Sequence, residues 1–86
     1  MKLWILKPVE NLDDENNPWR YGKYDAYHGF VVRAETEEIA RQFAADVAYA
    51  ENNRFGNPWI NNVYTTCYEL TSDGSVGIVL SDFLAG

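Results

Sequence analysis

Cysteine and histidine are almost absent from the sequence, with Cys67 and His28 as the only examples in 86 residues. A single cysteine excludes a disulfide within the chain and a cysteine-based zinc site. A lone cysteine inside an apolar strand is typical of a small buried side chain. His28 has no cysteine or triad-like serine nearby, so we interpret it as structural. The sequence therefore predicts neither a metal site nor a cofactor.

Positive charge is also scarce. Seven Lys and Arg residues stand against thirteen Asp and Glu residues, which gives a net charge of −6. Binding to nucleic acid requires a positive patch that neutralises phosphates, so this balance argues against direct nucleic-acid binding. It argues equally against an anionic membrane surface. A protein partner with a basic surface fits the charge better.

Long apolar runs are missing. Residues 3–6 are too few for the core of a signal peptide, and Lys7 and Pro8 interrupt them. No run approaches the length of a membrane span, so we expect a cytoplasmic protein. The hydrophobic content of 47% nevertheless indicates a folded chain. At this length, residues 1–86 predict a single domain.

The clearest local pattern is a strand at residues 30–34 followed by an amphipathic helix. Thr36 has the chemistry of a helix N-cap, and Glu37 follows at the positive end of the helix dipole. Glu37 and Arg41 form an i,i+4 pair in the favourable order. Two neighbouring rows of apolar side chains along the helix are expected to pack on the sheet, while Arg41 and the acidic residues face solvent. These rows are Ile39, Phe43 and Val47, and Ala40, Ala44 and Ala48.

Residues 2–9 predict a first strand with apolar residues on both faces. Leu3 and Ile5 alternate with Trp4 and Leu6. Such a strand normally lies inside a sheet that is covered on both sides. One helix covers only one side, so the second face is expected to be covered by loops, covered by another chain, or exposed. Pro8 indicates a missing neighbour on one side of the strand end.

Residues 64–71 and 76–84 predict a hairpin around Ser72, Asp73 and Gly74. A three-residue loop with Gly74 in a left-handed conformation sorts the side chains best. It pairs Tyr68 with Ile78 and places the large apolar side chains of both strands on one face. The fold class predicted from these elements is α+β with the order β-β-α-β-β. One helix packs on one face of a four-stranded, mainly antiparallel sheet, and the strand order stays open.

Acidic residues group in three short clusters, and we interpret them as a surface for the basic partner. The ordinary alternative is that a charge of −6 serves solubility. The predicted acidic binding residues are Glu10, Asp13, Asp14, Glu15, Glu37, Glu38 and Asp46.

No catalytic motif accompanies this acidity, so the chain is predicted not to be an enzyme. In size, acidity and lack of catalytic motifs it resembles, as a class, the small phage-encoded inhibitors of host defence. Anti-CRISPR and anti-restriction proteins belong to that class. The resemblance implies a partner with a basic groove for nucleic acid. Inhibitors of this class bind such a groove, and some of them mimic DNA.

Two alternatives remain open. The first is a self-associating structural domain, a homodimer through the open sheet face, which would cover Trp4 and Leu6. The second is an aromatic site for a small ligand, built from Trp19, Tyr21, Tyr24 and Trp59. Trp19 and some of the tyrosines are instead expected to fold over the open sheet face.

Overall fold

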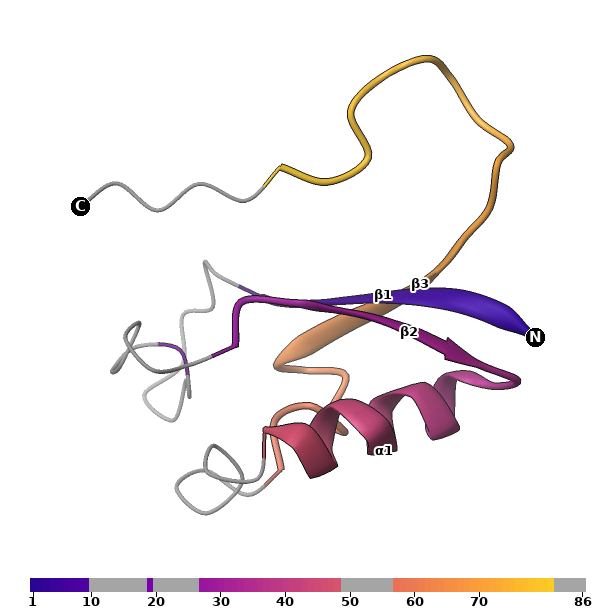
Figure 1. The fold of residues 1–86 in the computed structure, drawn as a ribbon. Helices are drawn as coiled ribbons and strands as arrows, with labels where there is room; N and C mark the ends of the chain where they lie inside the picture. The colour runs from indigo at the N-terminus through magenta and orange to yellow at the C-terminus, as the bar shows by residue number, and fades with distance from the viewer. Residues whose placement is uncertain (10–18, 20–26, 49–56, 82–86) are drawn as a thin grey trace.

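The computed structural model describes residues 1–9, 19, 27–48 and 57–81. They form a three-stranded antiparallel sheet with one helix against one face (Figure 1). The elements are β1 (Lys2–Pro8), β2 (Phe30–Ala34), α1 (Glu37–Val47) and β3 (Thr65–Leu70). Among these residues, no helix has both the length and the apolar composition needed to cross a membrane.

The strand order is β2-β1-β3, which places β1 in the centre. Since β1 is antiparallel to both neighbours, β2 and β3 run in the same direction on either side of it. The chain passes from β2 to β3 through α1, below the sheet in Figure 1. Pro8 pairs only with Thr65, because the β2 ladder ends at Leu6. This confirms that the proline lacks a neighbour on one side.

Alternation along β1 divides the sheet into two faces, as predicted. Trp4 and Leu6 point toward α1, and Leu6 is fully buried in the core. The face that lacks a helix carries Leu3 and Ile5, so the expectation that Trp4 and Leu6 need additional cover was wrong. We call this second face the open face. By strand register it consists of Leu3, Ile5, Lys7, Val31, Arg33, Thr66, Tyr68 and Leu70.

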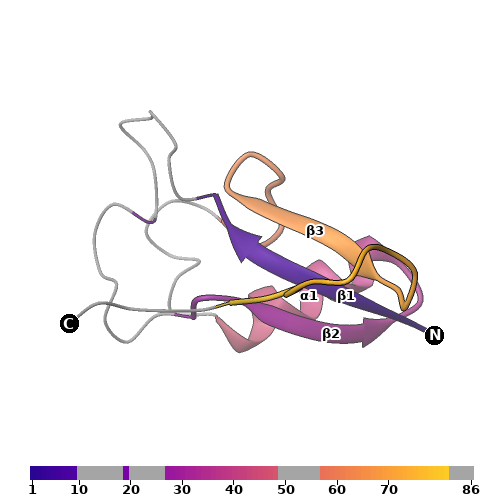
Figure 2. The same ribbon diagram turned by 90° about the horizontal axis from the view of Figure 1, so that it is seen from above.

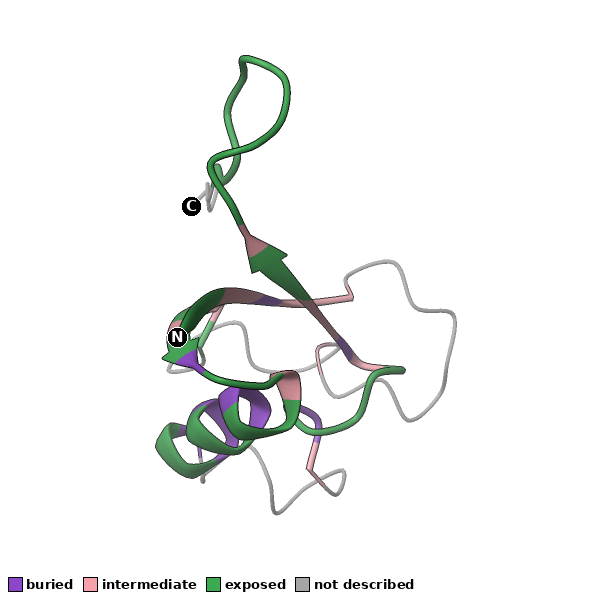
Figure 3. Cartoon of the chain, turned by 90° about the vertical axis from the view of Figure 1, so that its right-hand side faces the viewer, coloured by how far each residue is buried: buried purple, intermediate pink, exposed green. Residues whose placement is uncertain are grey.

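Helix α1 begins where the sequence predicts. The Thr36 hydroxyl accepts a hydrogen bond from the backbone N–H of Ile39 at 3.3 Å. Its orientation differs from the prediction. The buried residues are Ala40, Arg41, Ala44 and Ala45, and the adjoining cap residue Ala48 is buried as well. The predicted alanine row is buried, whereas the row of larger side chains is exposed. Figure 3 shows this division of the helix into a buried and an exposed side.

The prediction of a fourth strand was wrong. Residues 71–81 contain no strand, and all of them are exposed. Gly74 has a φ of +141°, so the expected positive φ is present without the hairpin. Residues 82–84, the end of the predicted strand, lie outside the described part. The apolar side chains of residues 76–80 are exposed rather than packed against β3, and a strand forms only where its side chains find a packed surface.

Candidate functional site

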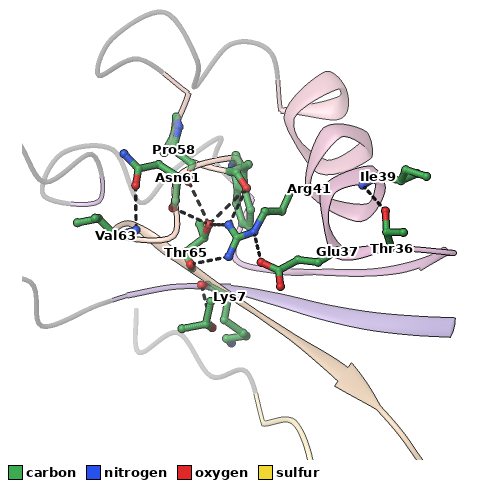
Figure 4. Close-up of polar contacts among 11 residues, drawn as sticks. Lys7, Thr36, Glu37, Ile39, Arg41, Pro58, Asn61, Val63 and Thr65 are labelled. Atoms are coloured by element: carbon green, nitrogen blue, oxygen red, sulfur yellow. Dashed lines mark hydrogen bonds and ion pairs between the residues drawn. The ribbon is translucent and has the colours of Figure 1, made fainter.

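The orientation of α1 is fixed by Arg41, whose side chain lies inside the molecule. Its Nε is 2.8 Å from Glu37 Oε2, which confirms the predicted pair. Nη1 donates to the Trp59 carbonyl at 3.1 Å and to Thr65 Oγ1 at 2.7 Å, and Nη2 donates to the Thr65 carbonyl at 3.2 Å (Figure 4). A guanidinium with a carboxylate and three oxygen acceptors tolerates burial. The prediction that Arg41 faces solvent was therefore wrong.

Thr65 is fully buried and joins Arg41 to the turn that precedes β3. Its hydroxyl lies within hydrogen-bond distance of the Pro58 carbonyl at 3.1 Å and of the Asn61 carbonyl at 3.2 Å. Asn61 Oδ1 in turn accepts from the Val63 backbone N–H at 2.9 Å. Helix, turn and strand are thus linked through two adjacent side chains. Rotation of α1 about its axis would deprive the Trp59 carbonyl and the two Thr65 oxygens of the Arg41 donors.

The outward half of α1 therefore carries the large apolar row. Ile39, Phe43 and Val47 are 45, 55 and 51% exposed. They follow one another at i, i+4 spacing and so form a continuous stripe. Isolated exposed apolar residues are ordinary, but a stripe of three on one helix is a candidate interaction surface. We call these three residues the helix stripe.

Acidic residues flank the helix stripe. Glu38 and Asp46 are exposed in the neighbouring row, and Gln42 between them donates to Asp46 at 2.8 Å. Glu37 belongs to the predicted acidic set, but its carboxylate pairs with Arg41 while its side chain is 42% exposed. The other four predicted acids lie outside the described residues: Glu10, Asp13, Asp14 and Glu15. Of the predicted acidic surface, the structure brings Glu38 and Asp46 together beside apolar side chains.

The aromatic residues of the predicted ligand site have different surroundings. Trp59 is fully buried, so it is not part of a surface. Trp19 packs edge-on against Trp59 with centroids 5.4 Å apart, and its indole N–H donates to the Tyr64 carbonyl at 2.7 Å. Trp19 thus covers the helix side of the core, so its expected position over the open face was wrong. Tyr21 and Tyr24 lie outside the described residues.

The open face carries positive charge, whereas the residues beside the helix stripe are acidic. Of its eight residues, Lys7 and Arg33 are positively charged and none is acidic. Val31 and Tyr68 are exposed on either side of Ile5, the residue to which both are paired. Figure 2 shows residues 71–81 passing above this face. The two sides of the molecule therefore carry apolar surfaces with different charged margins.

No group of three or more metal-ligating side chains is found within residues 1–9, 19, 27–48 and 57–81. Cys67 lies on the helix side of β3, where burial raises the pKa of its thiol above the ordinary value. The positive charge of Arg41 acts in the opposite direction but does not offset burial. The thiol is therefore protonated at neutral pH, which is the state of an unreactive cysteine.

Comparison with known proteins supplies no relative. No family model matches the sequence. No curated protein and no solved structure matches it either.

Sequence reasoning missed the helix stripe because it assigned the largest apolar side chains to the core. The signal that could have revealed the orientation is the contiguous small face formed by Ala40, Ala44, Ala45 and Ala48. Four alanines allow close approach of a helix to a sheet. Large side chains on the adjacent row then remain available for another molecule.

Proposed function

We propose that the protein is a non-enzymatic binding module that docks the outward half of α1 onto a partner protein with an apolar groove and a basic margin. The observation that carries this proposal is the exposure of Phe43 in the middle of the helix stripe. A helix laid into a groove is a common mode of recognition, with anchors at i and i+4. Ile39 and Val47 supply the flanking anchors.

The charge of the partner follows from Glu38 and Asp46. Neither carboxylate is paired with a cation among the described residues, so both can pair with Lys or Arg on another protein. Charged groups at the margin of an apolar contact act mainly on the association rate and on partner choice. Their effect decreases with salt, because the Debye length falls to about 8 Å at physiological ionic strength.

The finer form of the proposal is inhibition of a nucleic-acid-binding protein. A net charge of −6 gives the chain the sign of a phosphate backbone, and an acidic face can occupy a groove that otherwise binds nucleic acid. This form rests on charge alone. Competition by added DNA separates it from the general proposal, since only a partner held through its nucleic-acid groove is released by DNA.

The test uses the tagged full chain as bait in a lysate of its native host, with nuclease present and elution by rising salt. Wild type is compared with Phe43→Ala, with the double variant Glu38→Lys/Asp46→Lys, and with Val31→Thr on the open face as the control. We expect one stoichiometric partner that wild type and the control both retain. Phe43→Ala loses it, and the double variant releases it at lower salt.

The contrary result is equally clear. A partner retained in the same amount and to the same salt by Phe43→Ala and by the double variant would not bind through α1. Circular dichroism of each variant verifies that the helix is intact. The aromatic ligand site has less support as an alternative, because Trp59 is buried and Trp19 is packed against it.

A further inference from the structure

A second exposed apolar segment lies on the same side of the sheet as the open face. Residues 76–80, which we call the C-terminal arm, have no regular secondary structure. Val76, Ile78 and Val79 are 106, 84 and 75% exposed, and Leu80 is 47% exposed. In Figure 1 the arm lies above the sheet, opposite α1. Four large apolar side chains in water within five residues represent a substantial unsatisfied surface.

The arm of a given copy covers little of its own open face. Leu80 is the arm residue that lines a pocket of about 150 Å³ against the sheet. The other lining residues are Ile5, Lys7, His28, Gly29, Phe30 and Val31. Tyr68, on the far side of β1, remains 65% exposed. In the single chain, the arm residues and the open-face residues Val31 and Tyr68 thus remain exposed.

We propose that the C-terminal arm of each copy packs on the open face of a second copy, giving a twofold dimer with exchanged arms. Each copy presents one arm and one open face on the same side of the sheet, so a single twofold axis satisfies both pairs. The contact is closed and isologous. It buries apolar surface that otherwise remains in contact with water.

Charge favours a second copy over the basic partner proposed for α1. The open face carries Lys7 and Arg33 and no carboxylate, so a basic surface would meet like charges there. The arm carries no charged residue. An uncharged apolar segment can cover Ile5 and Val31 while the two cations stay at the margin. This dimer does not depend on the proposed function of α1, since it uses the opposite side of the molecule.

Sedimentation equilibrium of the full chain over a range of concentrations tests the dimer. We expect a reversible monomer–dimer equilibrium that high salt does not weaken. Ile78→Ser in the arm and Tyr68→Thr on the open face should each raise the dissociation constant at least about tenfold, as expected when one apolar anchor is lost from an interface centre. Phe43→Ser, a similarly exposed apolar residue on α1, should leave it unchanged.

A spin label separates exchange between copies from closure within one copy. The label is attached at Ser75→Cys, in a Cys67→Ser background, on unlabelled protein that is then mixed with ¹⁵N-labelled protein lacking the label. Broadening of the Val31 and Tyr68 amides in the ¹⁵N-labelled copy supports the proposal. A monomer at all concentrations, an unchanged dimer in Ile78→Ser, or broadening confined to α1 amides would each overturn it.

Discussion

Arg41 and Thr65 form the polar link between the helix and the sheet. The guanidinium Nη1 lies 2.7 Å from Thr65 Oγ1, and Nη2 lies 3.2 Å from the carbonyl oxygen of the same residue. Arg41 is 6% exposed and Thr65 is fully buried, so water does not replace either partner when the contact is lost. This relationship decides which half of α1 is available to other molecules.

Replacing Arg41 with Met should lower the free energy of unfolding by about 3 kcal/mol. The substitution leaves buried oxygens of Thr65 and Trp59 without their charged donor, and such losses are costly. Denaturant unfolding measures the change. Gln42→Met, at the exposed neighbouring position, is the matched control and should change the stability by less than about 0.5 kcal/mol. Equal losses in the two variants would contradict the role assigned to Arg41.

Thr65→Val removes the hydroxyl while keeping the shape of the side chain. We expect a loss of about 1–3 kcal/mol, because one buried N–H of Arg41 Nη1 loses its acceptor. A double-mutant cycle with Arg41→Met should give a coupling energy of at least about 0.5 kcal/mol. Additive effects of the two substitutions would show that the 2.7 Å contact contributes nothing of its own.

The corrected orientation of α1 is tested by two adjacent positions. Phe43→Ala should change stability little, because more than half of the Phe43 side chain is exposed. Ala44→Leu should cost about 1–3 kcal/mol, because Ala44 is 1% exposed and a larger side chain overpacks the contact with the sheet. Thermal unfolding of both variants gives the comparison. The reverse order of stabilities would restore the orientation predicted from the sequence.

Loss of the helix cap has a smaller expected effect. Thr36→Ala removes the acceptor for the Ile39 N–H and should cost about 1 kcal/mol. Thr36→Ser keeps the hydroxyl, so it should retain most of the stability. Urea midpoints of the two variants measure the difference, and indistinguishable midpoints would mean that the 3.3 Å contact does not stabilise the helix.

Cys67 gives a prediction about pH. Burial raises the pKa of its thiol in the folded protein. The folded state therefore holds its proton to higher pH than the unfolded state does. The contribution of this thiol to stability is complete below its ordinary pKa and decreases as the pH rises through it. Alkylation by iodoacetamide should be slow in the folded protein and rapid in urea, whereas equal rates at one pH would contradict the shift.

Elements with a local signal were predictable from the sequence. The three observed strands, the Thr36 cap and the Glu37–Arg41 pair all depend on residues close together in the chain. The partners of Arg41 are different, since Trp59 and Thr65 lie 18 and 24 residues away. The spacing of residues within α1 carries no information about Trp59 or Thr65. Arg41 was therefore assigned to solvent and the helix stripe to the core.

The C-terminal arm shows the other limit. Its β-branched residues and the Ser-Asp-Gly turn favour a hairpin locally, but a strand forms only where its side chains find a packed surface. In the described part of the chain they do not. Glu38 and Asp46 were named as binding residues from charge, and their position beside Phe43 became evident only from the fold.

The small alanine face of α1 has a consequence for how this protein can change. The residues that hold the helix to the sheet are not those it presents outward, so stability and, under the proposed function, partner choice depend on separate positions of the same helix. Substitutions at Ile39, Phe43 and Val47 can therefore accumulate at little thermodynamic penalty. Under the proposed function, the partner could therefore change, by natural variation or by design, while the scaffold stays constant.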